Sequence, residues 1–175
     1  MTDMFNKVTS QQDIISKLLS KLPGFSGYIE RENRRSSDKV IRETIARKFE
    51  EIWARISSLQ RDLIREGNLQ AVGDIESSAI KLRQFIDRVQ KASYGYSGFF
   101  DAVKINESEL TLMYQYDLDM MNLADQVTLA ADNVEASIGT DGMQASIRNL
   151  VTLSDQCVQT FNKRVEVING MHPLQ

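Results

Sequence analysis

Four apolar stripes at helical spacing run along the chain between about residues 37 and 169. Leucine, isoleucine, valine, phenylalanine and methionine recur in them at steps of three and four residues, the spacing that brings side chains to one face of an α-helix. Segments with the two-residue alternation of a half-buried β-strand are effectively absent. The pattern therefore predicts an all-α protein.

The length of the stripes constrains how the helices associate. The stripes cover residues 41–63, 72–89, 110–138 and 143–168. Helices of roughly 25–30 residues measure about 35–45 Å, and an isolated pair cannot cover apolar faces of that length on both members. Short connections between successive helices favour antiparallel neighbours. We therefore expect an elongated antiparallel up-down-up-down four-helix bundle with an additional N-terminal amphipathic helix.

The additional helix is predicted over residues 3–22. Its apolar positions share one side of the helical wheel and form the predicted partner-binding surface of an N-terminal arm: Met4, Val8, Ile15, Leu18, Leu19 and Leu22. Three lysines lie roughly opposite, and a Pro-Gly pair at residues 23–24 ends the helix. We therefore divide the chain into the arm with a glycine-rich hinge (1–27), the four-helix bundle (28–170) and a tail (171–175).

The chain offers few residues for catalysis or metal binding. Its single histidine, His172, lies in the predicted tail, and its single cysteine, Cys157, lies within the last apolar stripe. Zinc, haem and di-iron sites draw on several histidine, cysteine or paired carboxylate ligands. We therefore assign no catalytic, cofactor-binding or metal-binding residue and expect a protein that is not an enzyme and needs no cofactor.

Composition also bears on partners and location. A lone cysteine cannot form an intramolecular disulfide, which fits a reducing compartment. No segment near Met1 has the pattern of a signal peptide, and no run approaches the roughly 20 apolar residues of a membrane-spanning helix. The isoelectric point near 5.3 lacks the basic signature of nucleic-acid binding. We expect a cytoplasmic protein without a nucleic-acid partner or a small-molecule substrate.

An aromatic segment connects the second and third of the long helices. Residues 92–102 place four rings among glycines and serines: Tyr94, Tyr96, Phe99 and Phe100. A bundle connection needs only a few polar residues. These rings either plug the end of the bundle or form an exposed patch, since aromatic anchors carry much of the binding energy at interfaces. The sequence leaves both interpretations open.

Charge is distributed unevenly between the two halves of the chain. Residues 1–91 carry 17 Lys and Arg against 13 Asp and Glu, whereas residues 92–175 carry 4 against 11. The acidic half is either balanced by basic neighbours within the same bundle or complementary to the basic half of another copy. A salt-sensitive assembly would follow from the second alternative.

Asp117 interrupts the third apolar stripe at a position where the helical wheel favours an apolar residue. A carboxylate on such a face must be paired or hydrogen-bonded, because desolvating it alone costs several kcal/mol. We predict a buried polar pairing of Asp117 with Arg42 or with a tyrosine hydroxyl. The alternative is a functional carboxylate in an enzyme or ligand-binding bundle.

Two segments resemble a known group of sequences. RSSDKVIRE (residues 35–43) and ASYGYSGFFDA (residues 92–102) are similar to segments of a group of uncharacterised bacterial all-helical proteins. The likeness covers roughly the first two long helices and the aromatic segment. It implies a bacterial origin and a helical fold, and it carries no activity, cofactor or site residue with it.

These features favour an interaction protein. We expect an adaptor or self-assembling scaffold that contacts a protein partner or further copies of itself through the arm and the aromatic segment. The first alternative is a peripheral protein that lies on a membrane, at the inner face of the cell membrane, through the amphipathic helix of residues 3–22. The second is an enzyme with a polar site near Asp117.

Overall fold

The computed structural model describes the backbone of residues 2–22, 34–92 and 107–169, and the side chains of residues 12–22, 38–92 and 108–169. Within these residues the chain forms five α-helices and no β-strand. The helices are α1 (Thr2–Lys21), α2 (Arg34–Arg65), α3 (Leu69–Lys91), α5 (Glu107–Ser137) and α6 (Met143–Ile168). The all-α prediction is therefore confirmed.

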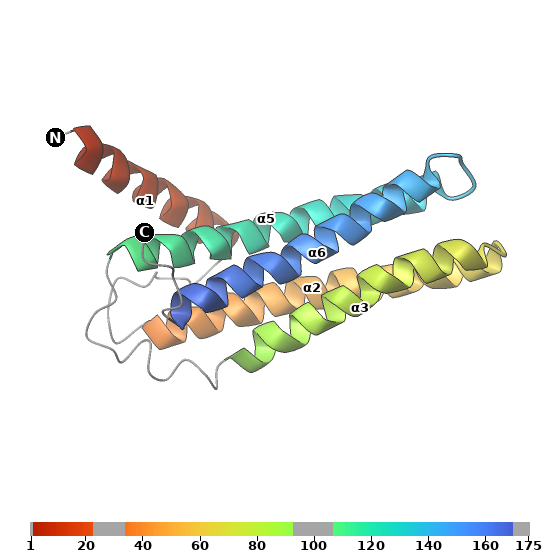
Figure 1. The fold of residues 1–175 in the computed structure, drawn as a ribbon, viewed down its shortest axis with the longest axis horizontal. Coiled ribbons are helices and arrows are strands. Elements are labelled where there is room, and N and C mark those ends of the chain that lie inside the picture. The colour runs from red at the N-terminus through yellow and green to blue at the C-terminus, as the bar shows by residue number, and fades with distance from the viewer. Residues whose placement is uncertain (1, 23–33, 93–106, 170–175) are drawn as a thin grey trace.

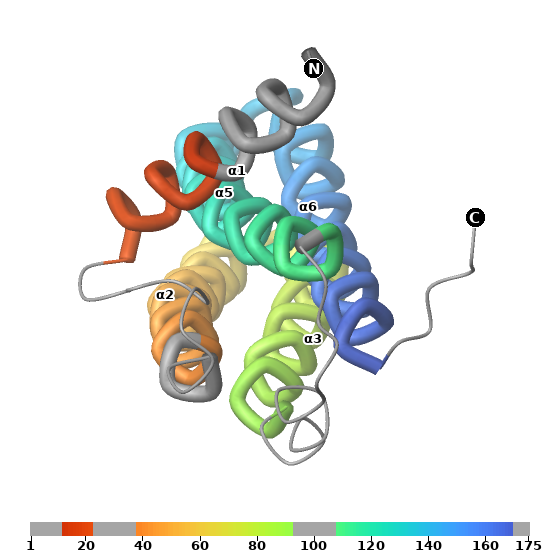
Figure 2. The backbone as a smooth tube through the Cα atoms, turned by 90° about the vertical axis from the view of Figure 1, so that its left-hand side faces the viewer, coloured from red at the N-terminus to blue at the C-terminus, as the bar shows by residue number. Residues whose placement is uncertain are grey.

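The four long helices form an elongated body (Figure 1). Seen along its length, α2, α3, α6 and α5 follow one another around a ring, and each contacts its neighbours (Figure 2). The connection between α2 and α3 and the one between α5 and α6 lie at the same end of the body (Figure 1). Helix α1 lies outside the ring and packs on α5.

The turn between α2 and α3 shows why α2 ends and α3 begins at these residues. Gly67 has φ +75°, a left-handed conformation that costs glycine little. The Asn68 amide donates to the Leu63 carbonyl at 3.0 Å and the Gly67 amide to the Ile64 carbonyl at 3.0 Å, as in a Schellman motif. The Asn68 side chain then accepts a hydrogen bond from the Ala71 amide at 3.1 Å. One short segment thus ends α2 and caps α3.

The core is continuous from one end of the body to the other and includes the end of α1. Near its middle, the rings of Phe49 and Phe85 lie 4.6 Å apart, and those of Phe85 and Phe161 lie 6.0 Å apart, both edge-to-face. Three helices therefore meet at Phe85. Nearby, the buried hydroxyls of Ser78 and Ser154 share a hydrogen bond of 2.5 Å that joins α3 to α6.

The uneven charge of the two halves is paired within the chain where α2 faces α5. Arg55 contacts Asp132 at 2.5 Å and Glu135 at 2.7 Å. Farther along the same two helices, Lys48 contacts Asp125 at 3.3 Å. The basic first pair of helices thus lies against the acidic second pair inside one molecule.

Candidate functional site

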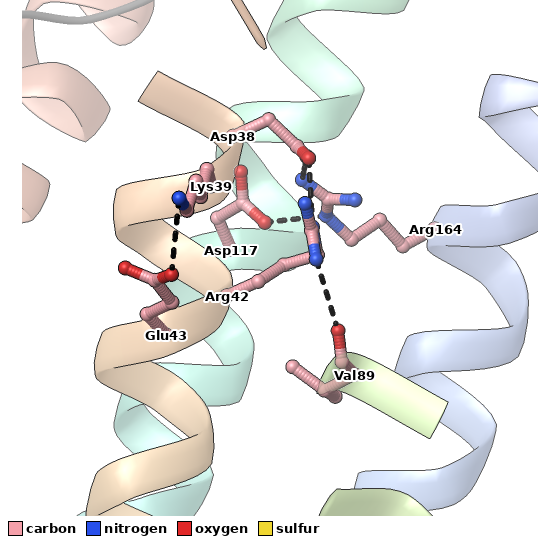
Figure 3. Close-up of polar contacts among 7 residues, drawn as sticks. All are labelled: Asp38, Lys39, Arg42, Glu43, Val89, Asp117 and Arg164. Carbon is pink, nitrogen blue, oxygen red and sulfur yellow. Dashed lines mark hydrogen bonds and ion pairs between the residues drawn. The ribbon is translucent and has the colours of Figure 1, made fainter. Parts of the chain in front are cut away.

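A buried cluster of four charged side chains lies where α2 begins and α6 ends (Figure 3). Arg164 of α6 donates from Nε to Asp117 Oδ1 of α5 at 2.5 Å and from Nη2 to Asp38 Oδ1 of α2 at 2.6 Å. Arg42, one turn after Asp38, donates to Asp38 Oδ2 at 2.7 Å. None of the four side chains is more than 6% exposed. The cluster therefore ties three helices together away from water.

Arg42 extends this network to the fourth long helix. Its Nη1 donates to the carbonyl of Val89 at 3.2 Å. Val89 lies in the last turn of α3, where carbonyl groups have no partner within the helix. The guanidinium also places positive charge near the negative end of the helix dipole. All four helices of the body thus converge on one set of hydrogen bonds.

The chemistry of the cluster suits a structural role. It contains two carboxylates and two guanidinium groups, and guanidinium stays protonated in proteins. The two negative and the two positive charges compensate one another, whereas a single one of them buried alone would be strongly destabilising. A slip of one turn between the helices would separate these partners.

The sequence identified two members of this cluster and missed two. Asp117 was expected to pair with Arg42 or with a tyrosine hydroxyl; it receives a hydrogen bond from Arg164, and Arg42 joins the same network through Asp38. A signal for Arg164 was available in the sequence. It stands at a stripe position three residues after Phe161, just as Asp117 interrupts the stripe of α5.

The end of the arm is docked on the body. Leu18 and Leu22 are 0% and 1% exposed, Ile15 is half-buried, and Leu19 is 47% exposed. The side chains of Met4 and Val8 lie outside the described residues. The arm therefore buries only part of the apolar surface predicted for it, and Leu19 stands at the edge of the contact. Within the described part of the chain, no helix has the length and apolar character needed to cross a bilayer.

Helix α5 has a second apolar face that explains where the arm lies. Tyr114, Leu118 and Met121 are buried, and on the helical wheel they fall about 100° from the stripe that faces the other long helices. Asp125, four residues after Met121 on this face, contacts Lys21 of α1 at 2.5 Å. We call Tyr114, Leu118, Met121 and Asp125 the arm seat. Because two of its faces are covered, α5 carries apolar residues on more than one side and lacks the single apolar stripe of an ordinary surface helix.

A polar contact lies at the Asp125 end of the arm seat. The Asp125 carboxylate lies between Lys21 of the arm and Lys48 of α2. Partial burial raises the pKa of Asp125, but hydrogen bonds and charge attraction from the two lysines outweigh it and hold this pKa below its ordinary value of 3.8. The ionised carboxylate therefore holds the arm to two elements at once.

Of the remaining features singled out in the sequence, the structure describes Cys157 but not the aromatic segment, the hinge or the tail. The aromatic residues Tyr94, Tyr96, Phe99 and Phe100, the hinge and the tail lie outside the described residues. Cys157 is fully buried, and burial raises the pKa of its thiol to about 12. A thiol in this state is a poor nucleophile at neutral pH.

Shallow grooves lie between neighbouring helices on the outside of the body. One, of about 330 Å³, runs between α5 and α6 and is lined largely by amides: Asn122, Gln126, Gln156 and Gln159. Another, of about 280 Å³, lies between α2 and α5 and includes Lys48 and Asp125. Neither is lined by Asp117. Among the described residues, no group of three or more His, Cys, Asp or Glu side chains is arranged to hold a metal ion.

Comparisons of the chain with family models, with curated proteins and with solved structures give no match. The resemblance to bacterial all-helical proteins therefore stays a prediction.

Proposed function

We propose that the protein is a non-enzymatic helical-bundle interaction protein, an adaptor or self-assembling scaffold, that makes its contacts through the arm and the aromatic segment. The observation that carries this proposal is the state of the arm. Among its described side chains, helix α1 packs on the core through two buried leucines and the partly buried Ile14 and Ile15, makes an ion pair to Asp125, and presents Leu19 to solvent.

The strength of this attachment supports a role in binding. Burying a leucine contributes about 1.5–3 kcal/mol, so Leu18 and Leu22 together contribute roughly 3–6 kcal/mol. The exposed ion pair to Asp125 adds about 0–1 kcal/mol. Ordering a 20-residue helix that is marginal in isolation opposes these gains. A partner that offers the arm a comparable apolar surface can therefore compete with the body for it.

The body behind the arm is, in this proposal, an antiparallel up-down-up-down bundle. Only residues 66–68 separate α2 from α3, and only residues 138–142 separate α5 from α6. Connections this short leave no room for a crossover and favour antiparallel neighbours. An elongated body of this kind suits a scaffold that displays a contact helix at one side.

The two alternatives are less well supported by the same contacts. An enzyme site near Asp117 needs an accessible carboxylate, whereas the Asp117 side chain is fully buried and hydrogen-bonded to Arg164. Membrane binding through α1 needs the apolar face of the arm, part of which packs on α5 through Leu18 and Leu22. Flotation with anionic vesicles at low salt checks this second alternative, which requires recovery of the protein with the vesicles.

The test of the proposal compares two neighbouring exposed positions on the arm. Leu19→Asp places a charge on the exposed leucine, and Ser20→Asp places the same charge on an exposed polar residue. Neither change removes a buried group. We expect Leu19→Asp to weaken self-association in light scattering and Ser20→Asp to leave it unchanged, with the same circular dichroism for both. A protein that stays a monomer at all concentrations, whichever variant is measured, and binds no partner would contradict the proposal.

A further inference from the structure

We infer that the arm seat on α5 takes the arm of a second copy of this chain, so that two molecules exchange their arms reciprocally. The inference rests on the proposed function and names the partner: the occupant is the α1 helix of another molecule, docked through the same residues that hold α1 here. A reciprocal exchange fills both seats and closes the assembly as a two-fold dimer.

The contacts of the arm are local and therefore transferable. Leu18, Lys21 and Leu22 lie within little more than one turn of α1 and provide the fully buried contacts and the ion pair of the docked end. On the body, α1 packs on α5, and Lys21 contacts Asp125 of α5, which also contacts Lys48 of α2. A second copy carries the same three residues at the same spacing, so it can form every contact described for the intramolecular arm.

The arm seat continues into an uncovered groove. Asp125 and Lys48, which hold Lys21 at the end of the arm, also line the groove between α2 and α5. Beyond them the groove is lined by Ile52, Ala124 and Thr128. This groove is continuous with the contact that the arm already makes.

The connector is long enough to link two bodies. Eleven residues, 23–33, separate the docked Leu22 from the start of α2 at Arg34. At about 3.3–3.6 Å per residue, such a segment reaches roughly 40 Å when extended. This reach is comparable to the length of α2, about 48 Å for its 32 residues. The arm can therefore leave its own α5 and still reach the same seat on an adjacent body.

The exposed side of the docked arm gives the exchanged form an additional contact. Leu19 is 47% exposed when the arm lies on its own body. The contacts within the seat are the same in both forms, so the balance between them depends on the surface that a neighbouring body covers. Leu19 supplies apolar surface for this purpose, because it stands at the edge of the seat beside two fully buried leucines.

Cross-linking between differently tagged copies tests the exchange. Two variants are co-expressed, one with Lys21→Cys and the other with Asp125→Cys, and both with Cys157→Ala. A short bis-maleimide reagent then joins the two tags only where the arm of one copy lies on α5 of the other. The matched control replaces Asp125→Cys by Asp155→Cys, an acidic residue of similar exposure that pairs with Lys81 on a different side of the body.

We expect the pair at positions 21 and 125 to give roughly tenfold or more cross-linked heterodimer than the pair at 21 and 155, because docking raises the effective concentration into the millimolar range. Adding Leu18→Ala to the first variant lowers this yield. Equal yields for the two pairs would overturn the exchange.

A single chain with both cysteines separates this inference from the proposed function. If Lys21→Cys and Asp125→Cys in the same chain cross-link only within that chain, the exchange is refuted. Self-association that Leu19→Asp still weakens would then leave the proposed function standing. A monomer whose behaviour no arm substitution changes contradicts both.

Discussion

Replacing Arg164 by methionine tests whether the buried charge cluster stabilises the body as its geometry implies. Methionine keeps much of the side-chain volume and removes the guanidinium that bonds Asp117 at 2.5 Å and Asp38 at 2.6 Å. Of the four charged groups, two carboxylates and one guanidinium then remain, so the buried cluster carries an excess negative charge. Both carboxylate side chains are at most 3% exposed, which prevents water from replacing the lost donor.

The expected loss of stability is large. Removing one partner of a buried ion pair costs about 3–5 kcal/mol. In a domain of this size each kcal/mol lowers Tm by roughly 2–4 °C, so Tm falls by roughly 6–20 °C. The double variant Arg164→Met with Asp117→Leu leaves the neutral pair of Asp38 and Arg42. It recovers most of the loss, with a coupling energy of about 2–3 kcal/mol.

Urea unfolding followed by circular dichroism measures these differences. Lys81→Met is the matched control, because it removes an ion pair to Asp155 of 2.8 Å whose partners are 28% and 50% exposed. That change costs less than about 1 kcal/mol. Losses for Arg164→Met and Asp117→Leu that simply add in the double variant would refute the coupling, as would a loss for Arg164→Met no larger than that of the control.

Three further outcomes follow from the structure. Phe85→Ala removes the ring that contacts Phe49 and Phe161 and lowers the free energy of unfolding by about 3–5 kcal/mol in urea titrations, whereas a loss below about 1 kcal/mol would contradict this packing. Cys157, buried and with a pKa of about 12, reacts with iodoacetamide at pH 8 only after unfolding; rapid reaction of the native protein would contradict its burial. The lowered pKa of Asp125 means that its contribution to arm docking is complete above 3.8 and is lost as the pH falls through the lower folded value. Proteolysis of the arm should therefore increase on acidification below 3.8 in the wild type, with a smaller change in Asp125→Asn, and identical pH profiles would rule this contact out.

Much of the body could be predicted because its information is local. Stripes at steps of three and four residues locate α2, α3, α5 and α6, and Gly67 marks the end of α2 because its φ of +75° suits glycine. In α2 the helix begins at Arg34, several residues before the apolar stripe that starts at residue 41. Helix ends depend on weak local interactions, so their positions are less constrained than the stripes.

The polar contacts were less accessible to prediction because each joins residues far apart in the chain. Asp117 is recognisable as a buried acid from its place in a stripe, yet its partner Arg164 lies 47 residues later and Asp38 lies 126 residues before Arg164. Arg42 was a reasonable expectation, since it belongs to the same cluster. Choosing among several arginines requires knowing which ends of the helices meet.

The sequence by itself determined that this protein is helical and located one buried face of each long helix, since the period of the apolar residues is a property of each segment alone. Only the tertiary structure decided that Asp117, Arg164, Asp38 and Arg42 form one cluster and that the arm ends on a second face of α5. Both outcomes depend on the mutual placement of helices, because a charge or a leucine can be buried stably only where another element supplies its partner.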